Sequence, residues 1–268
     1  MATTDKLFAG SIPEIYDQLL VPLIFDSNAH DLAGRVADAK PGTVLEIAAG
    51  TGALTRALAA RLPDARIVAT DLNQPMLDKA AERHPPGRVE WQQADALALP
   101  FPDESFDAVA CQFGAMFFPD KVKGYSEARR VLKAGGRYLF NVWDRISANE
   151  FADVVTEALV AVFPQDPPRF MARTPHGYHD AARIRRDLET AGFADIAVEA
   201  VDGVSRASSP RIPAIAFCQG TPLRNEIEAR DAGRLEEATE RAAEAIARRF
   251  GDGAVEGRIR ALVMTARR

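Results

Sequence analysis

Residues 44–52 read V-L-E-I-A-A-G-T-G, a short apolar run followed by an acidic residue and a turn that contains two glycines. A Gly-x-Gly turn after a buried strand is typical of a nucleotide-type cofactor site in a doubly wound α/β domain. The glycines let backbone N–H groups approach a ligand, and the helix predicted from Ala53 onward presents its positive N-terminal end to the same place. The stretch therefore predicts a mostly parallel sheet with a cofactor at the end of its first strand.

The residues near this turn suit a cationic ligand better than a dinucleotide. Thr55 stands where a dinucleotide turn has a third small residue, and the carboxylate of Glu46 lies just upstream, where it disfavours a diphosphate. Downstream, residues 66–70 predict a second buried strand that ends at Asp71, about 20 residues after the turn, where a carboxylate accepts hydrogen bonds from both ribose hydroxyls. A third strand over residues 89–93 leads to Asp95.

Strand and helix patterns alternate between residues 43 and 142, which is the rhythm of a parallel sheet covered on both faces. Strands are expected over residues 43–47, 67–70, 89–93, 106–111 and 136–142, and helices over 54–61, 75–82 and 122–132. The carboxyl ends of such strands meet at one edge of the sheet, where ligands bind. We therefore expect Glu46, Asp71, Asp95 and Gln112 to converge.

Helical segments are predicted on both sides of this core. Two helices precede it, over residues 12–20 with Ser11 as N-cap and over residues 22–37. The segments after residue 142 are expected in this order: an amphipathic helix (149–163), a Pro-rich loop (164–175), a helix capped by Asp180 (180–191), a sixth strand (193–201), a Pro-punctuated segment (208–223), a charged helix (233–250) and a last strand (260–265). The charges of the helix over 233–250 indicate a solvated face, with a partner-binding surface as the alternative.

Composition indicates an ordinary enzyme-sized domain. A chain of 268 residues with 47% hydrophobic content can bury one core with a helical cap. The net charge of −5 provides no basic field, which disfavours a nucleic-acid partner. Cys111 and Cys218 are too few and too far apart for a metal site or a disulfide framework. Without a long apolar stretch or a signal-peptide pattern at the start, we expect no membrane span and a cytoplasmic location.

Five motifs in a consistent order carry a family resemblance. They are E-I-A-A-G-T-G (46–52), D-L-N-Q-P-M-L (71–77), A-D-A-L-A-L-P-F (94–101), S-F-D-A-V (105–109) and R-V-L-K-A-G-G (130–136). With them the chain resembles class I S-adenosylmethionine-dependent methyltransferases, most closely the small-molecule branch related to the ubiquinone and menaquinone biosynthesis C-methyltransferases (methyltransferase type 11). The resemblance covers residues 44–141 well and the rest in outline. Ala48 stands where many relatives have glycine, a substitution common in this branch.

The resemblance implies a Rossmann-like, doubly wound, mostly parallel seven-stranded sheet with an antiparallel last strand, N-terminal helices and helical cap insertions. We expect one domain over residues 1–268, with an N-terminal helical cap (1–40), a cofactor-binding core (41–142) and two substrate-cap insertions (143–192 and 203–257). The implied cofactor is S-adenosyl-L-methionine, which leaves as S-adenosyl-L-homocysteine. No metal is expected.

Within that family pattern, each cofactor residue has an expected role. Asp71 binds the ribose, Asp95 accepts from the adenine amino group, Glu46 orients the loop and the methionine amine, Met76 covers the adenosine, and Tyr16 closes the site. The remaining expected cofactor residues are Ala48, Gly50, Thr51, Gly52, Leu72, Ala96, Leu97, Gln112 and Phe113.

Each of these side chains also has a structural interpretation. Asp71 is the alternative N-cap of the helix after residue 73, and Asp95 a turn residue before Pro100. Glu46 is alternatively a strand-end acid, and Met76 and Tyr16 are alternatively packing side chains.

The sequence says less about the site of the methyl acceptor than about the cofactor site. Phe113, Phe117 and Trp143 follow the fourth and fifth strands and are expected to line it, although such aromatics are also ordinary core residues. The stretch T-P-H-G-Y-H-D (174–180) falls in the insertion that caps the acceptor pocket in this family, so His176 and Tyr178 are expected in the pocket. A loop that merely enters the next helix is the alternative. His176, His179 and Tyr16 are candidate catalytic groups, but methyl transfer does not require a base and none is assigned.

The leading hypothesis is methyl transfer to a small, partly apolar acceptor. A quinone-like or phenolic ring is the first choice, and an amine, a thiol or a lipid headgroup the second. C-Q-F-G (111–114) replaces the N-P-P-Y tetrapeptide of enzymes that methylate bases and glutamine amides. A non-catalytic cofactor-binding or regulatory protein stays open, as does a homodimer. An NAD(P)-dependent oxidoreductase lacks an identifiable hydride-transfer partner.

Overall fold

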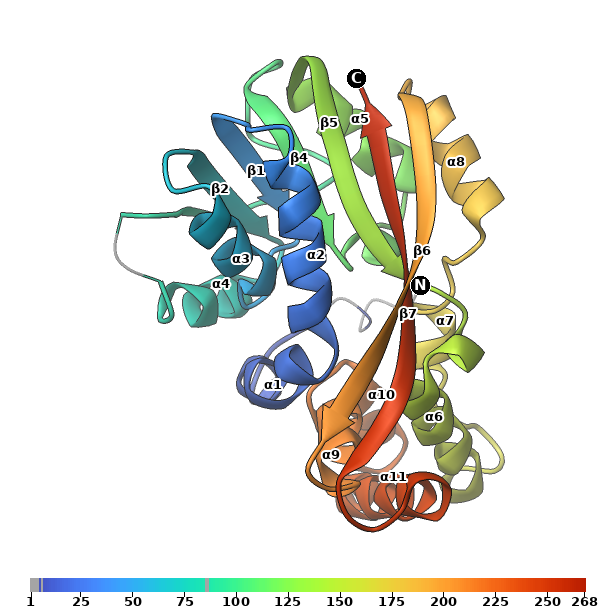
Figure 1. Cartoon of the computed structure of the whole chain (residues 1–268). Coiled ribbons are helices and arrows are strands. Elements are labelled where there is room, and N and C mark those ends of the chain that lie inside the picture. The colour runs from blue at the N-terminus through green and yellow to red at the C-terminus, as the bar shows by residue number, and fades with distance from the viewer. Residues whose placement is uncertain (1–4, 6, 85–86) are drawn as a thin grey trace.

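The computed structural model describes residues 5, 7–84 and 87–268 (Figure 1). Within this part of the chain, seven strands form one sheet in the order β3-β2-β1-β4-β5-β7-β6. The strands are β1 (Thr43–Ile47), β2 (Arg66–Asp71), β3 (Glu90–Gln93), β4 (Phe106–Gln112), β5 (Leu132–Trp143), β6 (Ala194–Ala207) and β7 (Val255–Arg267). β7 runs antiparallel to both of its neighbours, β5 and β6, and the pairs from β3 to β5 are parallel. The predicted Rossmann-like sheet with an antiparallel last strand is confirmed.

The helical elements surround this sheet. They are α1 (Ile12–Ile15), the π-helix η2 (Tyr16–Phe25), α2 (Asp26–Ala37), α3 (Ala53–Arg61), α4 (Gln74–Ala81), η3 (Ala115–Phe117), α5 (Lys121–Val131), η4 (Ile146–Ala148), α6 (Glu150–Val162), α7 (Phe170–Arg173), α8 (Ala181–Thr190), α9 (Arg211–Gln219), α10 (Leu223–Asp231), η5 (Ala232–Arg234) and α11 (Leu235–Phe250).

Two apolar layers enclose the sheet. On one face, α2 and α3 pack through Leu32 and Leu54 onto Val44. On the other face, α5 and α8 contribute Tyr125 and Ile184 to a second cluster (Figure 1). Because both faces are covered, the middle of each central strand is apolar, as in residues 67–69 and 108–111, which is why the strand positions were readable in the sequence.

The two helices predicted before the sheet form one continuous helical run, so that division was wrong. The run passes from α1 through η2 into α2, and Pro22 lies inside the π-helical part rather than at the start of a new helix. Proline lacks an N–H, and its ring clashes with the carbonyl four residues earlier. The wider π turn, in which the Asp26 N–H donates to the Val21 carbonyl, accommodates both effects of Pro22. Ser11 occupies the predicted N-cap position, but its hydroxyl bonds Arg224 and makes no cap hydrogen bond.

β6 and β7 are longer than predicted. Their pairing continues from the sheet to Ala207 and Val255, so the two strands extend beyond the others as an arm (Figure 1). The outer half of β6 contains Asp202, Gly203 and Arg206, which interrupt an apolar strand pattern. Backbone hydrogen bonds between the two strands form whatever the side chains are. Pairing with β7 therefore continues β6 beyond the point at which its amino-acid composition predicts the strand to end.

A helical cap is attached at the end of this arm. It contains α6, α9, α10 and α11, and the predicted Pro-punctuated segment 208–223 is largely the helix α9. Pro210 and Pro213 sit at the N-cap and in the first turn of α9, where a missing N–H costs nothing.

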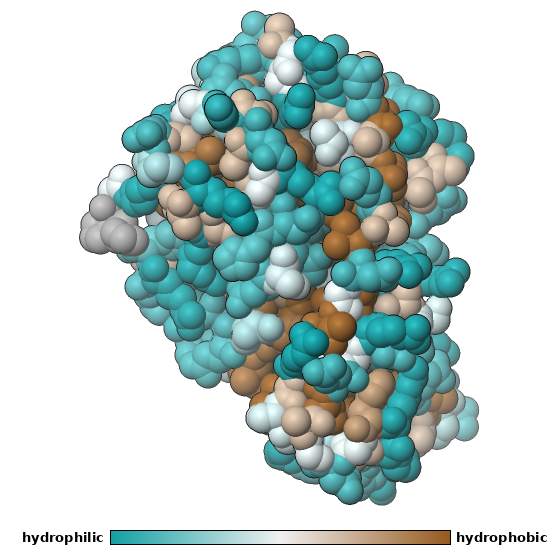
Figure 2. Space-filling model, viewed as in Figure 1, coloured by the Kyte–Doolittle hydropathy of each residue, from teal (hydrophilic) through white to brown (hydrophobic). Residues whose placement is uncertain are grey.

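The cap packs directly on the N-terminal run. Gly220, at the end of α9, lies so close to η2 that an added Cβ would come within 3.3 Å of the Tyr16 nitrogen. From β6, the Ser205 hydroxyl donates to the Leu23 carbonyl at 2.8 Å. Figure 2 shows a hydrophobic area where the N-terminal helices meet the lower part of β6 and β7. The side of the molecule where the acceptor is expected is therefore enclosed by segments far apart in the sequence.

Candidate active site

A cleft lies at the carboxyl ends of β1, β2 and β4 and holds about 750 Å³ of space continuous with solvent. The structure brings together here most of the predicted cofactor residues: Tyr16, Ala48, Gly50, Asp71, Leu72, Met76, Asp95, Ala96, Leu97, Gln112 and Phe113.

The Gly-rich turn forms one wall through left-handed backbone conformations. Ala48, Gly50 and Gly52 have φ values of 56°, 57° and 79°. The turn is pinned to the end of β2 because the Gly50 N–H donates to Asp71 Oδ2 at 2.9 Å. Ala48 adopts a conformation that favours glycine, which agrees with its position in a turn where relatives have glycine.

Glu46, Thr51 and Gly52 do not line the cleft. Glu46 is fully buried beneath the turn, where the Thr55 hydroxyl donates to its Oε2 at 2.6 Å. Burial raises the pKa of Glu46 to about 8, and its Oε1 has no hydrogen-bond partner among the described residues. Gly52 begins α3 with its Cα packed toward His84 and Trp91. Their predicted cofactor contacts stay predictions, and the observed role of these residues is to build the turn.

Asp71 presents its carboxylate at the middle of the cleft. Oδ2 accepts from Gly50 N–H, and Oδ1 accepts from the backbone N–H of Asn73 at 2.8 Å. Burial raises the pKa of Asp71. The N-cap position of α4 belongs to Asn73, so the capping interpretation of Asp71 is wrong. Oδ1 also accepts from Asn73 Nδ2 at 3.3 Å, whereas Oδ2 has one partner and keeps capacity for a ligand hydroxyl.

Asp95 makes the predicted turn and lines the cleft, and its predicted contact with adenine stays a prediction. Its Oδ1 accepts from the Leu97 N–H at 2.9 Å, which makes the predicted turn, and the residue also lines the cleft. The turn presents Ala96 and Leu97 to the same space.

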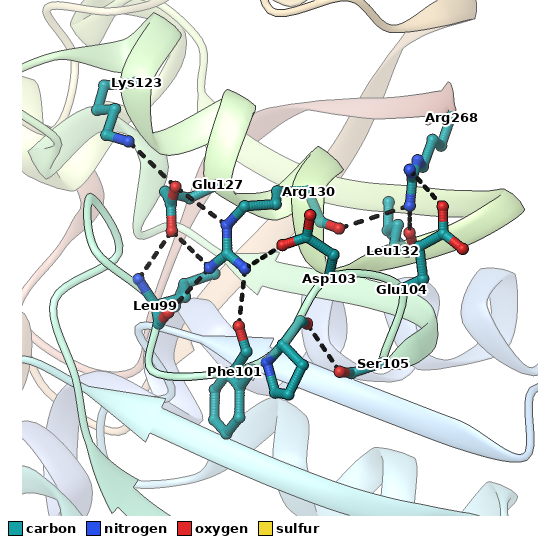
Figure 3. A network of polar contacts seen from close by, with 11 residues as sticks. Leu99, Phe101, Asp103, Glu104, Ser105, Lys123, Glu127, Arg130, Leu132 and Arg268 are labelled. Atoms are coloured by element: carbon teal, nitrogen blue, oxygen red, sulfur yellow. Dashed lines mark hydrogen bonds and ion pairs between the residues drawn. The ribbon is translucent and has the colours of Figure 1, made fainter.

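A charged network holds the segment after Asp95 against α5 (Figure 3). Arg130 donates to the carbonyls of Leu99 and Phe101 at 2.9 and 2.7 Å, and Glu127 accepts from the Leu99 N–H at 3.0 Å. The Arg130 guanidinium lowers the pKa of Glu127 to about 2. Arg130 belongs to the R-V-L-K-A-G-G motif, so that motif anchors the one that carries Asp95. The sequence reasoning did not find this link, although the Glu127–Arg130 spacing on one helix face was a signal for an ion pair.

Tyr16 lies over the cleft on the N-terminal run. Its ring stacks on Phe25 with centroids 5.1 Å apart, and burial raises the pKa of its hydroxyl, which therefore stays protonated. Two ion pairs fasten the run to α4: Glu14–Lys79 at 2.5 Å and Asp17–Arg83 at 2.6 Å. The arrangement fits the closing role expected for Tyr16.

A second chamber, whose roughly 410 Å³ of non-atom space includes space continuous with solvent, adjoins the cleft. The two spaces share Phe8, Tyr16, Phe113 and Phe117. Its other walls are Leu20, Ile24, Phe25, Met116, Trp143, Phe170, Met171, Pro175, Phe217 and Thr221. None of these lining residues is an Asp, Glu, Lys or Arg. We call this space the aromatic chamber.

Phe113 and Trp143 form the wall of the aromatic chamber nearest the sheet. Their rings stack at a centroid distance of 3.8 Å and an interplanar angle of 8°. Phe113 has a positive φ of 50° and is held there by hydrogen bonds from its N–H to Asn141, including one to Oδ1 at 3.0 Å. The backbone strain turns the ring toward the chamber.

Three residues of the stretch 174–180, His176, Tyr178 and His179, lie in three different environments. His176 is buried behind Trp143 and lines a third, small space, which we call the inner chamber; its roughly 280 Å³ of non-atom space includes space continuous with solvent. Tyr178 lines none of these three spaces, since its hydroxyl donates to Asp187 at 2.6 Å between α8 and α5. His179 is exposed, with Nδ1 2.7 Å from the His176 carbonyl. Only His176 keeps a geometric basis for an acceptor-site role.

Several residues of the aromatic chamber were not predicted. Phe8 comes from the N-terminus, Phe170 and Met171 from α7, and Phe217 from α9. The sequence holds no signal for them, because a single apolar residue in a helix reads the same whether it faces a core or a cavity. Among the described residues, no group of three or more His, Cys, Asp or Glu side chains could hold a metal.

Comparison with known proteins agrees with this site. The model of a methyltransferase domain matches residues 44–136. The chain is 42% identical over 99 residues to the demethylmenaquinone methyltransferase of Deinococcus radiodurans, a match that covers 36% of this chain and 41% of that protein. It is 33% identical over 170 residues to the ubiquinone/menaquinone biosynthesis C-methyltransferase UbiE of Teredinibacter turnerae, covering 58% of this chain and 68% of that enzyme.

A solved structure shows the same fold at low identity. It is the phosphoethanolamine N-methyltransferase 2 of Haemonchus contortus in complex with S-adenosyl-L-methionine, with a TM-score of 0.59, 19% identity and coverage of 96% of this chain and 56% of that one. The sheet, the cleft at its strand ends and these matches define a class I S-adenosylmethionine-dependent methyltransferase. The chain belongs to the methyltransferase family that includes UbiE, and its cofactor is S-adenosylmethionine. Within the described residues, no helix has the length and apolar character needed to cross a membrane.

Proposed function

We propose that this enzyme transfers the methyl group of S-adenosylmethionine to a small, uncharged, largely apolar acceptor, with a quinone-like or phenolic ring as the first choice. The observation that carries the proposal is the aromatic chamber, which opens beside the cofactor cleft and shares Tyr16, Phe113 and Phe117 with it. A flat ring buries its apolar faces against such walls, and aromatic pairs add attraction beyond the area buried.

The residues present in the cleft fit the cofactor. We infer that Asp71 accepts from the ribose hydroxyls and that Asp95 and the apolar Leu97 contact the adenine. When bound, S-adenosylmethionine supplies a methyl group already activated on a positively charged sulfur. Glu46 supports the turn from beneath, through the hydrogen bond that it accepts from the Thr55 hydroxyl.

The protein's own contribution is alignment and exclusion of water. The N-terminal run covers the cleft, and the chamber walls are rings and aliphatic side chains, so an acceptor held there meets the donor in a fixed orientation and without competing solvent. Tyr16 keeps its proton because burial raises its pKa, so it serves as a hydrogen-bond donor and not as a base. A ring carbon or oxygen that is itself electron-rich suits this site.

Charged acceptors fit poorly. A protonated amine or a phosphate headgroup would be buried in the aromatic chamber without an opposite charge among its lining residues, which carries a large desolvation cost. The names of the Deinococcus and Teredinibacter relatives, which refer to quinone biosynthesis, support the same acceptor class.

The test is a labelled methyl-transfer assay. Purified protein with S-adenosylmethionine carrying a trideuterated methyl group is incubated separately with hydroquinones, phenols, alkylamines, thiols and phosphoethanolamine, and products are identified by mass spectrometry. We expect the label on ring compounds. Transfer to phosphoethanolamine or amines alone would contradict the proposal. Cofactor binding by calorimetry without transfer to any panel compound or cell-extract metabolite would favour the non-catalytic alternative.

A further inference from the structure

Three rings follow one another from the cofactor cleft into the protein. Phe113 lines the cleft, Trp143 stacks on it at 3.8 Å, and the His176 ring lies beyond Trp143 with centroids 6.2 Å apart. A flat acceptor that lies along this row has one end at the cofactor and the other end near His176.

The aromatic and inner chambers are neighbours along this row. They share Ile24, Trp143, Met171 and Phe217 as lining residues. Met171 is the adaptable member of the shared wall, because its unbranched side chain changes rotamer easily. A bicyclic ring in the aromatic chamber would therefore reach the inner chamber only if Met171 changed its rotamer.

The His176 ring has a defined tautomer. Its Nδ1 lies 2.8 Å from the carbonyl oxygen of Asp144. A carbonyl only accepts hydrogen bonds, so Nδ1 carries the hydrogen, and in the neutral ring Nε2 is an acceptor. Within the described part of the chain, Nε2 makes no hydrogen bond.

The other polar side chain of the inner chamber is already satisfied. Asn149 donates through Nδ2 to the Asp144 and Arg145 carbonyls, each at 3.2 Å, and its Oδ1 accepts from the Arg260 N–H at 3.0 Å. The remaining lining residues are apolar. His176 Nε2 is thus an acceptor at the end of an apolar passage, and a ligand that supplies a donor there gains a hydrogen bond that the empty site lacks.

His176 is poorly suited to remove a proton. Burial lowers its pKa to about 4, so the ring is neutral at ordinary pH and is a weak base. Proton removal from a phenol needs a base whose pKa is near the working pH. The geometry accordingly favours recognition of the acceptor over proton transfer.

We propose that His176 is a positioning residue whose Nε2 accepts a hydrogen bond from a hydroxyl group at the end of a flat, uncharged acceptor, opposite the end that receives the methyl group. This inference rests on the proposed function, since it assumes that the acceptor occupies the aromatic chamber. It narrows the acceptor class to rings that carry a hydroxyl at a distance from the reacting atom.

Binding of two matched probes tests the proposal without turnover. We would measure 2-naphthol and 2-methylnaphthalene by equilibrium dialysis against protein saturated with S-adenosylhomocysteine. The probes differ only in a hydroxyl replaced by a methyl group. We expect the native protein to bind 2-naphthol about fivefold more tightly, as one net hydrogen bond to a neutral acceptor implies.

Two variants assign this preference to His176. In His176→Phe the preference should fall to less than twofold, whereas His176→Gln, which keeps both a donor for Asp144 and an acceptor, should retain part of it. Unchanged affinity for S-adenosylhomocysteine shows that each variant is folded, because His176 does not line the cofactor cleft. If His176→Phe has lost affinity for S-adenosylhomocysteine, the role of His176 is decided by comparing the probe preference of His176→Gln with that of the native protein.

Each outcome has a defined meaning. A full preference for 2-naphthol in His176→Phe, no preference in the native protein, or no binding of either probe would overturn the role of His176. The labelled transfer assay described above is independent of these results. Transfer to ring acceptors without a hydroxyl preference would support the proposed function and refute this inference. A His176-dependent preference without any transfer would support the hydrogen bond to His176 and refute the proposed function.

Discussion

The two ends of the active site are built in different ways. The cofactor end takes its polar groups from strand ends: the left-handed turn around Gly50, the carboxylate of Asp71 and the turn at Asp95. The proposed acceptor end is a set of mostly rings and aliphatic side chains from the N-terminal run, the segment after β4 with η3, β5, α7 and α9, without a charged residue among them. The first is assembled by backbone conformation within one sheet edge, and the second by packing of distant segments.

This difference predicts that the two ends fail independently. Loss of a polar group at the cofactor end should weaken cofactor binding and leave the acceptor end packed. Loss of a ring at the acceptor end should reduce stability and acceptor binding and leave cofactor affinity close to the native value. Coupled failure of both ends would show that the comparison is wrong.

The largest effect is expected for Trp143→Ala. Trp143 is 4% exposed and stacks on Phe113, so truncation should lower the free energy of unfolding by roughly 3–5 kcal/mol. Chemical denaturation measures this, and calorimetry should show affinity for S-adenosylhomocysteine within about threefold of native, a difference of less than 1 kcal/mol. Trp143→Phe, which keeps a ring, is the matched control and should lose much less stability. A large loss of cofactor affinity in the stable variant would break the comparison.

The next effect concerns pH and His176. The pKa of this residue is lowered from its ordinary value of 6.5 to about 4 in the folded protein by burial, with His179 adding to the decrease. Below pH 6.5, His176 binds a proton in the unfolded chain but not in the folded chain. The free energy of unfolding should therefore fall between pH 6.5 and 4, by roughly 3 kcal/mol at most.

The measurement is unfolding by denaturant at intervals from pH 7.5 to 4. His176→Phe should lose this contribution and show a correspondingly flatter profile over that range. An identical slope in native protein and variant would mean that His176 titrates normally and is not as buried as the structure shows.

Asp71→Ala should produce the opposite pattern to Trp143→Ala. The change removes the acceptor for the ribose hydroxyls and for the Gly50 N–H, so affinity for S-adenosylmethionine should fall about 30- to 100-fold, corresponding to about 2–3 kcal/mol. Calorimetry measures the affinity, and dialysis of 2-naphthol reports whether the acceptor end is intact. Asp71→Asn is the control for shape and should keep part of the affinity. Native affinity in Asp71→Ala would refute the ribose assignment.

The smallest effect is expected for the ion pairs that fasten the N-terminal run. Lys79→Met removes the partner of Glu14 and should speed release of S-adenosylhomocysteine severalfold, because a partly exposed pair makes only a small contribution to the free energy. Stopped-flow measurements in low and high salt check this, since added salt should reduce the difference. Arg206→Met, which breaks an exposed pair with Glu256 on the outer arm, is the control and should not change the release rate.

The cofactor end was largely predictable from the sequence. Asp71, Asp95 and the turn through Gly50 were expected at one sheet edge, and the structure places them there. Each follows a strand whose apolar run is visible in the chain, and parallel strands align their ends whatever else surrounds them. The prediction was less accurate for Glu46, which lies beneath the turn and not on the cleft surface.

The acceptor end was predictable only in part. The sequence predicted Phe113, Phe117 and Trp143, because they lie at or after strand ends. Nothing in the neighbouring sequence indicates that Phe8, Met171 and Phe217 line the chamber. The stretch around His176 looked like one cluster, but Tyr178 turns toward Asp187 and His179 toward solvent. The direction of each side chain depends on which helix packs against the loop, and that information is not local.

The sequence by itself determined the sheet, its order of strands and helices and the acids at the strand ends, because apolar runs, glycines and capping residues act over a few neighbouring positions. Only the tertiary structure decided that the N-terminal run is continuous through Pro22, that β6 and β7 extend into an arm, and that the cap on this arm closes a chamber of rings. Those features depend on contacts between residues separated by most of the chain, whose free energy comes from burial and pairing rather than from local preference.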